Sequence, residues 1–509
     1  MRQTMRWGLA GLLLAMAVAP AAAQGERWSY EDPGSFWVSA TASLGDHGGQ
    51  AFADLGIHYP HCMLSGFSGE DVSPVWQVPG PQSAWPVAVD SADRADVHAS
   101  LTRQGGTLLL SCYDSAGPLW TRTVSTQVGG SSPVELHVTP DGSRIVVGAY
   151  EPSNGTTRAT VFSPSSSTPL ITRQLDFGSF RWFETDATGS LAFLGGMTVK
   201  VINLDTGALV HSQFLGFNPI NGDLSADGKL LAYSFTGGFR VYRKVGANYA
   251  LGLSYAHTPP TYPGTDVVFS ADGSRLAAAF EASDSTTRVD LACFNLDTSL
   301  RTMAATVNGS SPAGYANRIV GLALSSTGRR MAAGFWGDET GVAPEVQIFD
   351  TDQNQPSATY DLPGSALAID LSPDGKRLLV ASEQNHVSAS GTSRGRIDLF
   401  DLDARDFDLI GVPRAGATVE VRFRNAPAGP VARLLSATQP ARRPIYQEQL
   451  GGIMYLLRRS TGLGGAAGTV SPGNATFSYT FPNAAGEELY FQGLTSALTS
   501  EWARVTILP

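Results

Sequence analysis

A short phrase recurs along the chain at nearly constant spacing, and this repeat constrains the fold more than any other feature. Each copy is an apolar run, a turn of the form Ser/Thr-x-Asp-Gly-Ser/Lys-Arg, and a second apolar run. Copies of the turn occupy residues 139–144, 225–229, 270–275, 325–330 and 372–377, and degenerate copies occupy residues 45–48, 91–94 and 186–190. A supersecondary unit repeated at such a period indicates a repeat architecture in which neighbouring units bury each other's apolar faces.

The residues of the turn predict a β-hairpin. Asp accepts hydrogen bonds from the backbone just after it, and Gly adopts the positive φ that closes a tight connection between antiparallel strands. We therefore expect positive φ at Gly142, Gly228, Gly273 and Gly375, each between the first two strands of a unit.

The spacing of the turns sets the size of each unit. Consecutive turn markers from Gly48 to Gly375 are 39 to 55 residues apart, close to the roughly 40–50 residues of a four-stranded propeller blade. A second phrase, an apolar residue before Asn/Asp-x-Asp, ends a third strand, as in Ile202–Asp205 and Phe294–Asp297. The sequence therefore predicts an all-β fold with a β-propeller of eight four-stranded blades over residues 24–414. Seven blades and a closing segment are the alternative.

The two phrases together resemble the WD40-like and YVTN-type repeats of exported bacterial propellers. The resemblance covers most of residues 130–405, although the Trp-Asp dipeptide of eukaryotic WD40 blades is absent. It implies the fold and leaves the function open, because such propellers host binding proteins, lactonases, lyases and subunits of redox complexes.

The N-terminus has the pattern of a signal peptide. Arg2 and Arg6 precede an apolar run from Leu9 to Val18, and three alanines precede Gln24. The apolar run is too short to cross a bilayer as a helix, so we expect cleavage after residue 23. The predicted protein is exported to the periplasm or the extracellular space and is not inserted in the membrane.

The C-terminal part has a different pattern. From Gly416, alternating apolar residues begin with Val419, Val421 and Phe423 and continue in short runs separated by Gly, Pro and Asn. These runs predict a small β-sandwich over residues 415–509.

Composition limits the partners. The formal net charge is −10, and an acidic surface repels nucleic-acid phosphates. No haem, calcium, dinucleotide or phosphate-loop motif occurs, so we expect no cofactor, no metal site and no catalytic residue. Cys112 and Cys293 lie in strand-like runs and are expected to be core residues, with a Cys62–Cys112 disulfide as the alternative.

The loops between second and third strands hold the most informative polar residues, because in propellers they share a face with the inter-blade connections. Residues 151–158 and 281–288 are near copies that begin with Glu and end with Arg. The plainer interpretation is an exposed Glu–Arg pair that pins each hairpin, worth about 0–1 kcal/mol. The alternative is a polar or cation-binding ring. The ligand-binding candidates are Glu151, Arg158, Glu281, Arg288, Trp336, Asp338, Glu383 and His386.

Several first strands carry an ionisable residue just before the turn: His137, Glu184, Asp223 and Asp370. These residues are candidates for lining the central channel, and we expect them to bond the backbone of neighbouring blades and hold the ring. The leading hypothesis for function is a monomeric exported scaffold that binds a protein or glycan ligand. The alternatives are a lactonase- or lyase-type enzyme that uses the loop-face acids, and a quinoprotein-like redox subunit.

Overall fold

The computed structural model describes the propeller strands and most of their connections. The described residues are 26–31, 41–45, 49–58, 61–68, 73–80, 84–217, 219–258, 264–281, 288–308, 317–337, 343–383, 395–402, 407–410, 418–426, 429–437, 445–447, 452–454, 466–470, 473–480, 488–495 and 503–506. Every regular element within these ranges is a β-strand, as the sequence predicts.

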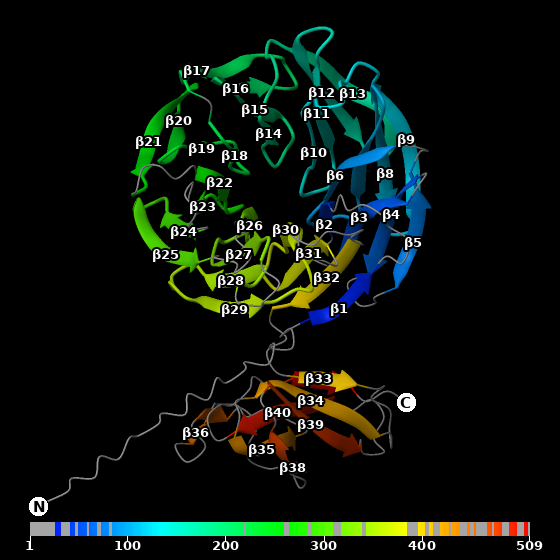
Figure 1. The fold of residues 1–509 in the computed structure, drawn as a ribbon, viewed down its shortest axis with the longest axis vertical. Helices are drawn as coiled ribbons and strands as arrows, with labels where there is room; N and C mark the ends of the chain where they lie inside the picture. The colour runs from blue at the N-terminus through cyan, green and yellow to red at the C-terminus, as the bar shows by residue number, and fades with distance from the viewer. Residues whose placement is uncertain are drawn as a thin grey trace, which may run out of the picture.

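Eight four-stranded antiparallel sheets form the blades of a ring (Figure 1). In the first seven blades the inner strand comes first in the chain and the outer strand last. Blades 1 to 3 are β2 (Thr41–Gly45), β3 (Gln50–His58), β4 (His61–Ser68) and β5 (Pro74–Pro79); β6 (Trp85–Ser91), β7 (His98–Gln104), β8 (Thr107–Asp114) and β9 (Gly117–Ser125); β10 (Val134–Val138), β11 (Ile145–Glu151), β12 (Thr156–Ser163) and β13 (Ser166–Leu175).

Blades 4 to 7 follow in the same order around the ring. They are β14 (Trp182–Thr185), β15 (Leu191–Gly195), β16 (Thr198–Asn203) and β17 (Leu209–Phe214); β18 (Gly222–Leu224), β19 (Leu230–Phe235), β20 (Gly238–Val245) and β21 (Asn248–Ala256); β22 (Gly264–Phe269), β23 (Arg275–Glu281), β24 (Arg288–Asn295) and β25 (Leu300–Asn308); β26 (Ile319–Leu324), β27 (Arg330–Phe335), β28 (Val346–Asp350) and β29 (Pro356–Tyr360).

The eighth blade joins the two ends of the propeller. Its inner strands are β30 (Ala366–Leu371), β31 (Arg377–Glu383) and β32 (Gly395–Asp401), and its outer strand is β1 (Glu26–Glu31) from the start of the described chain. β1 pairs antiparallel with β32, with Tyr30 opposite Ile397, and Figure 1 shows this first strand beside the last blade. The ring therefore has eight blades, and the alternative of seven is wrong.

The turn glycines have the predicted conformation. Gly142, Gly228, Gly273 and Gly375 have φ of 69°, 64°, 67° and 72°. In one copy of the turn, Ser274 N donates to Asp272 Oδ1 at 2.9 Å. Each copy is therefore a hairpin that Gly closes and Asp braces, as its residues predict.

The core lies between blades. The two middle strands of a blade are buried on both faces, and β23, for example, is buried over Leu276–Phe280. Alanines in that strand let β23 and β24 of blade 6 pack closely against blade 7, where Met331 and Phe335 complete the cluster. Cys112 and Cys293 are buried free thiols; the side chain of Cys62 lies outside the described residues.

The remaining strands form separate sheets. They are β33 (Phe407–Ile410), β34 (Thr418–Ala426), β35 (Gly429–Ala437), β36 (Ile445–Gln447), β37 (Gly452–Met454), β38 (Ala466–Val470), β39 (Gly473–Thr480), β40 (Glu488–Thr495) and β41 (Ala503–Thr506). β33 pairs with β34 and not with a blade. The last propeller strand therefore ends at Asp401, and the strands of the C-terminal part begin before residue 415.

Candidate binding face

The path of the chain gives the propeller two chemically different faces. One carries the hairpin turns between the first and second strands of each blade, and we call it the turn face. The other carries the second-to-third strand loops and the connections between blades, and we call it the loop face.

The turn face is closed by its own hydrogen bonds. Neighbouring turns are joined through the backbone, since Asp272 N donates to Ser326 O and Ser326 N to Pro373 O. The turn arginines add further links, and Arg330 Nη1 donates to Gly375 O at 2.7 Å. These polar groups of the turns are thus already used within the ring.

The loop face holds cavities. Three are lined by its segments within the described part of the chain. They have volumes of about 620, 610 and 280 Å³ and lie at blades 3 and 4, at blades 2 and 3, and at blades 5 and 6. Volumes of about 300–1,000 Å³ are typical of ligand sites, so the two larger cavities are the candidates for binding.

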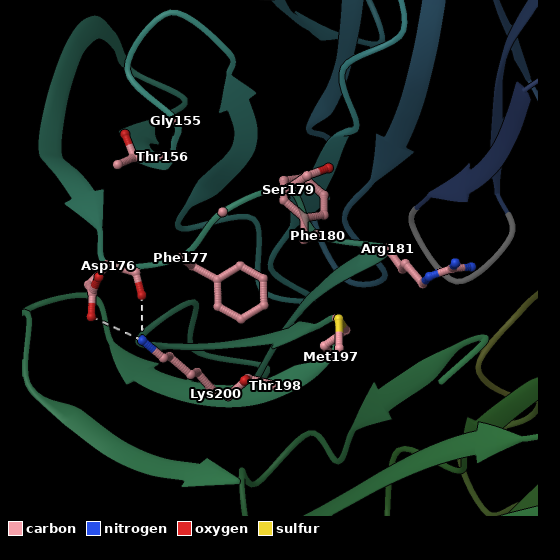
Figure 2. Close-up of a pocket in the computed structure, with 12 residues that line it drawn as sticks. Gly155, Thr156, Asp176, Phe177, Ser179, Phe180, Arg181, Met197, Thr198 and Lys200 are labelled. Carbon is pink, nitrogen blue, oxygen red and sulfur yellow. Dashed lines mark hydrogen bonds and ion pairs between the residues drawn. The ribbon is translucent and has the colours of Figure 1, made fainter. Parts of the chain in front are cut away.

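The cavity at blades 3 and 4 is lined by described residues from both blades. Its wall comprises the end of the β11–β12 loop, the connection from Asp176 to Arg181 and the start of β16. Figure 2 shows Asp176 and Lys200 at one end, the Phe177 ring in the middle and Arg181 at the other end. Lys200 Nζ lies 3.1 Å from Asp176 Oδ2.

The walls of this cavity are held in place by hydrogen bonds. Thr157 N donates to Phe177 O at 2.7 Å, and Thr157 Oγ1 donates to Gly178 O at 2.7 Å. These bonds tie the β11–β12 hairpin to the connection that follows blade 3. A site fixed in this way loses little conformational entropy when it binds.

Glu151, at the end of β11, stabilises the same β11–β12 hairpin through its side chain. It is fully buried and pairs with Arg158, whose Nε lies 3.0 Å from its Oε1. It also accepts hydrogen bonds from Ser125 Oγ at 2.6 Å and from Asn154 Nδ2 at 3.0 Å. The expectation of an exposed pair is therefore wrong for Glu151, because the neighbouring blade 2 covers its carboxylate and supplies a third donor.

The second copy of this loop motif has different bonds. Arg288 Nε donates to Asp290 at 2.8 Å, while Glu281 accepts the backbone N–H of Ile319 at 3.2 Å. Glu281 is half-buried, and burial raises its pKa. The similarity of the two loops in sequence thus does not extend to their contacts, because β24 carries Asp290 where β12 carries Thr160.

The remaining loop candidates lie on blades 7 and 8. Trp336 is half-buried, with the Arg318 guanidinium 5.3 Å from its ring centroid. Glu383 donates its backbone N–H to Ser365 O; Asp338 and His386 lie outside the described residues.

An aromatic residue that the sequence pattern did not identify is Trp85, which is 57% exposed beside the cavity at blades 2 and 3. It begins an inner strand, so the pattern of the loops does not single it out.

The inner strands carry carboxylates that bond the next blade. In each case one carboxylate oxygen accepts a backbone N–H from the inner strand of the following blade, at 2.6 to 2.9 Å. The pairs are Asp90 with Val138, Asp223 with Phe269, Asp266 with Leu322 and Asp370 with Leu44. The last of these pairs links blade 8 to blade 1.

His137 and Glu184 occupy the equivalent position on blades 3 and 4. His137 Nε2 lies 2.5 Å from Phe183 O and acts as the donor there, and it lies 3.8 Å from a Glu184 carboxylate oxygen. Burial lowers the pKa of His137, which keeps it neutral at pH 7. It therefore links blades 3 and 4 as a neutral donor.

Burial raises the pKa of these carboxyls. The pKa of Asp90, Asp223 and Asp370 rises to about 7 in each case, even though backbone N–H donors favour the charged form. Burial and the nearby Asp223 raise the pKa of Glu184 well above its usual range. The free-energy cost of burying the charged carboxylate is thus larger than the stabilisation that the backbone N–H donors give it.

Three further inner-strand carboxyls with a raised pKa were not among the candidates identified from the sequence: Asp90, Glu135 and Asp266. Burial raises the pKa of Glu135 to about 7 and that of Asp266 to about 6. Asp90 stands at the same distance before its turn as Asp370 does, but the degenerate turn of blade 2 hides this equivalence. Glu135 and Asp266 lie two residues earlier in their strands, on the same side as the predicted residues.

The acidic residues of the loop face that the structure describes lie in separate contacts. No group of three or more His, Cys, Asp or Glu side chains with metal-binding geometry occurs among the described residues. Glu151 and Glu281 belong to different blades and each has its own protein donors. Within the same residues, no helix has the length and hydropathy to cross a membrane.

Comparison with known proteins supports the fold. No protein-family model and no curated protein matches the chain. Among solved structures, Chaetomium thermophilum Sqt1 bound to the N-terminus of ribosomal protein L10 aligns with a TM-score of 0.53 at 12% identity, over 74% of this chain and 100% of that one. A second Sqt1 structure aligns with a TM-score of 0.54 at 11% identity, over 75% and 98%. At these identities the likeness shows the fold alone: an eight-bladed β-propeller of the WD40 type.

Proposed function

We propose that this protein is an exported propeller scaffold that binds a protein ligand on its loop face. The observation that carries the proposal is the contrast between the faces: cavities open among the loops, while the turns use their polar groups on one another. Function in propellers depends on such sites and not on the ring itself.

Two further points support a protein ligand. Sqt1, which shares the fold, is seen bound to the N-terminus of another protein. The loop face of this chain also exposes large side chains, including Met197 at 53% and Trp85 at 57%. Exposed Met and Trp are enriched where proteins contact one another.

Export is part of the proposal and rests on the N-terminal pattern of Arg2, Arg6 and the following apolar run. N-terminal sequencing of the protein recovered outside the cytoplasm should begin near Gln24. Recovery of chains that keep Met1 would exclude cleavage.

Site-specific photo-crosslinking in the producing cells tests the binding face. A crosslinking amino acid at the exposed loop-face positions Ser153 and Thr236 should yield adducts to one or a few proteins. The same substitution at the exposed turn-face positions Thr188 and Lys229 provides the matched control. Equal adducts from both faces, or adducts from the turn face alone, would contradict the proposal.

A further inference from the structure

The cavity at blades 3 and 4 has a cation at each end. Arg181 is exposed, and its guanidinium makes no hydrogen bond or ion pair with any residue that the structure describes. Lys200 stands at the opposite end, paired with Asp176, whose side chain is fully exposed. Two cations face one solvated carboxylate, so the cavity has a local positive excess in a chain with a net charge of −10.

Between the two ends the lining is mixed: it combines the apolar Phe177, Phe180 and Met197 with hydroxyl side chains such as Thr156 and Ser179. Phe177 and Phe180 are 9% and 3% exposed and form part of its floor, while Met197 at its edge is 53% exposed. In Figure 2 the Phe177 ring lies between Lys200 and Arg181. The order along the cavity is therefore the Lys200–Asp176 ion pair, a partly apolar surface and the Arg181 cation.

From this order we propose that the cavity binds an extended peptide segment of the protein partner, in which an acidic side chain adjoins a bulky apolar one. The acidic group pairs with the Arg181 guanidinium, which can hold a carboxylate through two parallel hydrogen bonds. The apolar side chain packs on the exposed Met197 side chain at the edge of the cavity. This inference rests on the proposed function and adds the chemistry of the segment that is recognised.

Other ligand classes fit the cavity less well. A glycan is recognised by stacking on an open aromatic face, and both rings here lie almost wholly inside the wall. A nucleic acid requires many cations along its phosphates, and the acidic chain repels it. A cationic segment is repelled by Arg181, and the one carboxylate at the opposite end, that of Asp176, already pairs with Lys200.

Two substitutions separate the apolar and charged parts of the interaction. Gly178 lines the cavity and a Cβ there would meet no atom within 4 Å, so Gly178→Leu adds bulk at the wall without a clash at its Cβ. Arg181→Glu reverses the charge at an exposed position. The controls are Ser165→Leu, which adds the same bulk at an exposed turn, and Arg122→Glu, which reverses a charge on the exposed side of β9.

The experiment is a selection of displayed random octapeptides on the purified mature protein, followed by fluorescence polarisation with the enriched peptides. We expect enrichment of Asp or Glu next to Leu, Met or Phe. Arg181→Glu should weaken binding of these peptides at least tenfold, Gly178→Leu should abolish it, and both controls should bind as the parent protein does. Circular dichroism and the thermal midpoint confirm that each variant is folded.

Three results would overturn the inference. They are enrichment of basic or purely apolar peptides, no enrichment at all, and unchanged binding in Gly178→Leu. Any of them combined with loop-face crosslinks would leave the proposed function standing and remove only the acidic–apolar segment. Crosslinks confined to the turn face would remove the proposed function itself.

Discussion

Asp370 lies where the ring closes, and replacing it should make stability less dependent on pH. Its carboxylate accepts hydrogen bonds from Leu44 N at 2.7 Å and from Ser43 Oγ at 3.2 Å, which join blade 8 to blade 1. In Asp370→Asn the amide oxygen can accept the same two bonds, and the negative charge is gone. The substitution therefore separates the hydrogen bonds from the cost of the buried charge.

The direction follows from proton binding. Burial, together with the charge of Asp93, raises the pKa of Asp370 from 3.8 to about 7. Between about pH 4 and pH 7 the folded chain holds a proton that the unfolded chain has released. Stability from this group is therefore fully present below about pH 4 and is lost as the pH rises from there through about 7.

The size of the effect follows from the same upward shift of the Asp370 pKa. A tenfold change in proton affinity corresponds to about 1.4 kcal/mol. The charged form of Asp370 therefore lowers the free energy of unfolding by roughly 2–4 kcal/mol at pH 8, where the lower figure allows for solvent screening. Asp370→Asn should recover this amount at pH 8 and change stability little at pH 4. Asp370→Ala should instead lose about 1–3 kcal/mol at pH 4, because Leu44 N then has no acceptor.

Urea denaturation of the purified protein at pH 4, 6 and 8 measures these differences. Asp297→Asn, at an exposed turn position, is the matched control and should leave the pH dependence unchanged. Equal stability of Asp370→Asn and the parent protein at pH 8 would refute the reasoning, as would a gain from Asp370→Asn that is as large at pH 4 as at pH 8.

Four further predictions concern other parts of the fold. Glu151→Ala should cost about 1–3 kcal/mol, because it removes the acceptor of the part-buried Arg158 guanidinium, the buried Ser125 hydroxyl and the Asn154 amide, whereas Glu281→Ala should cost under about 1 kcal/mol; equal losses in chemical denaturation would contradict the difference in burial. Gly273→Val should lower the thermal midpoint more than Gly273→Asn, since Asn tolerates positive φ. Gly142→Asn should lower the thermal midpoint more than Gly273→Asn does. A Cβ at Gly142 would lie 2.7 Å from the Cβ of Ala95, whereas the nearest atom to a Cβ at Gly273 is 3.7 Å away; equal midpoints would count against this. A C-terminal fragment that keeps β33 should be more resistant to proteolysis than one that lacks it, and the reverse order would show that the β33–β34 pairing is not needed.

The candidate site was only partly accessible from the sequence. The repeat identifies which positions lie on the loops and which lie near the axis, because a residue's place in a blade follows from its distance to the turn. It does not reveal which residues from different blades meet. The similar Glu–Arg loops of blades 3 and 6 show the difference: Glu151 is covered by blade 2, and Arg288 bonds Asp290 within its own strand.

The features of the fold that could be predicted from the sequence are local. The Asp-Gly turns, the strand pattern and the size of a blade depend on residues close together in the chain, and φ at Gly142 and Gly273 confirms the turns. Features that depend on distant residues arise only in the folded ring. The pairing of β1 with β32, the bond from Asp370 to Leu44 and the cavity between blades 3 and 4 each need segments that meet only when the blades pack side by side.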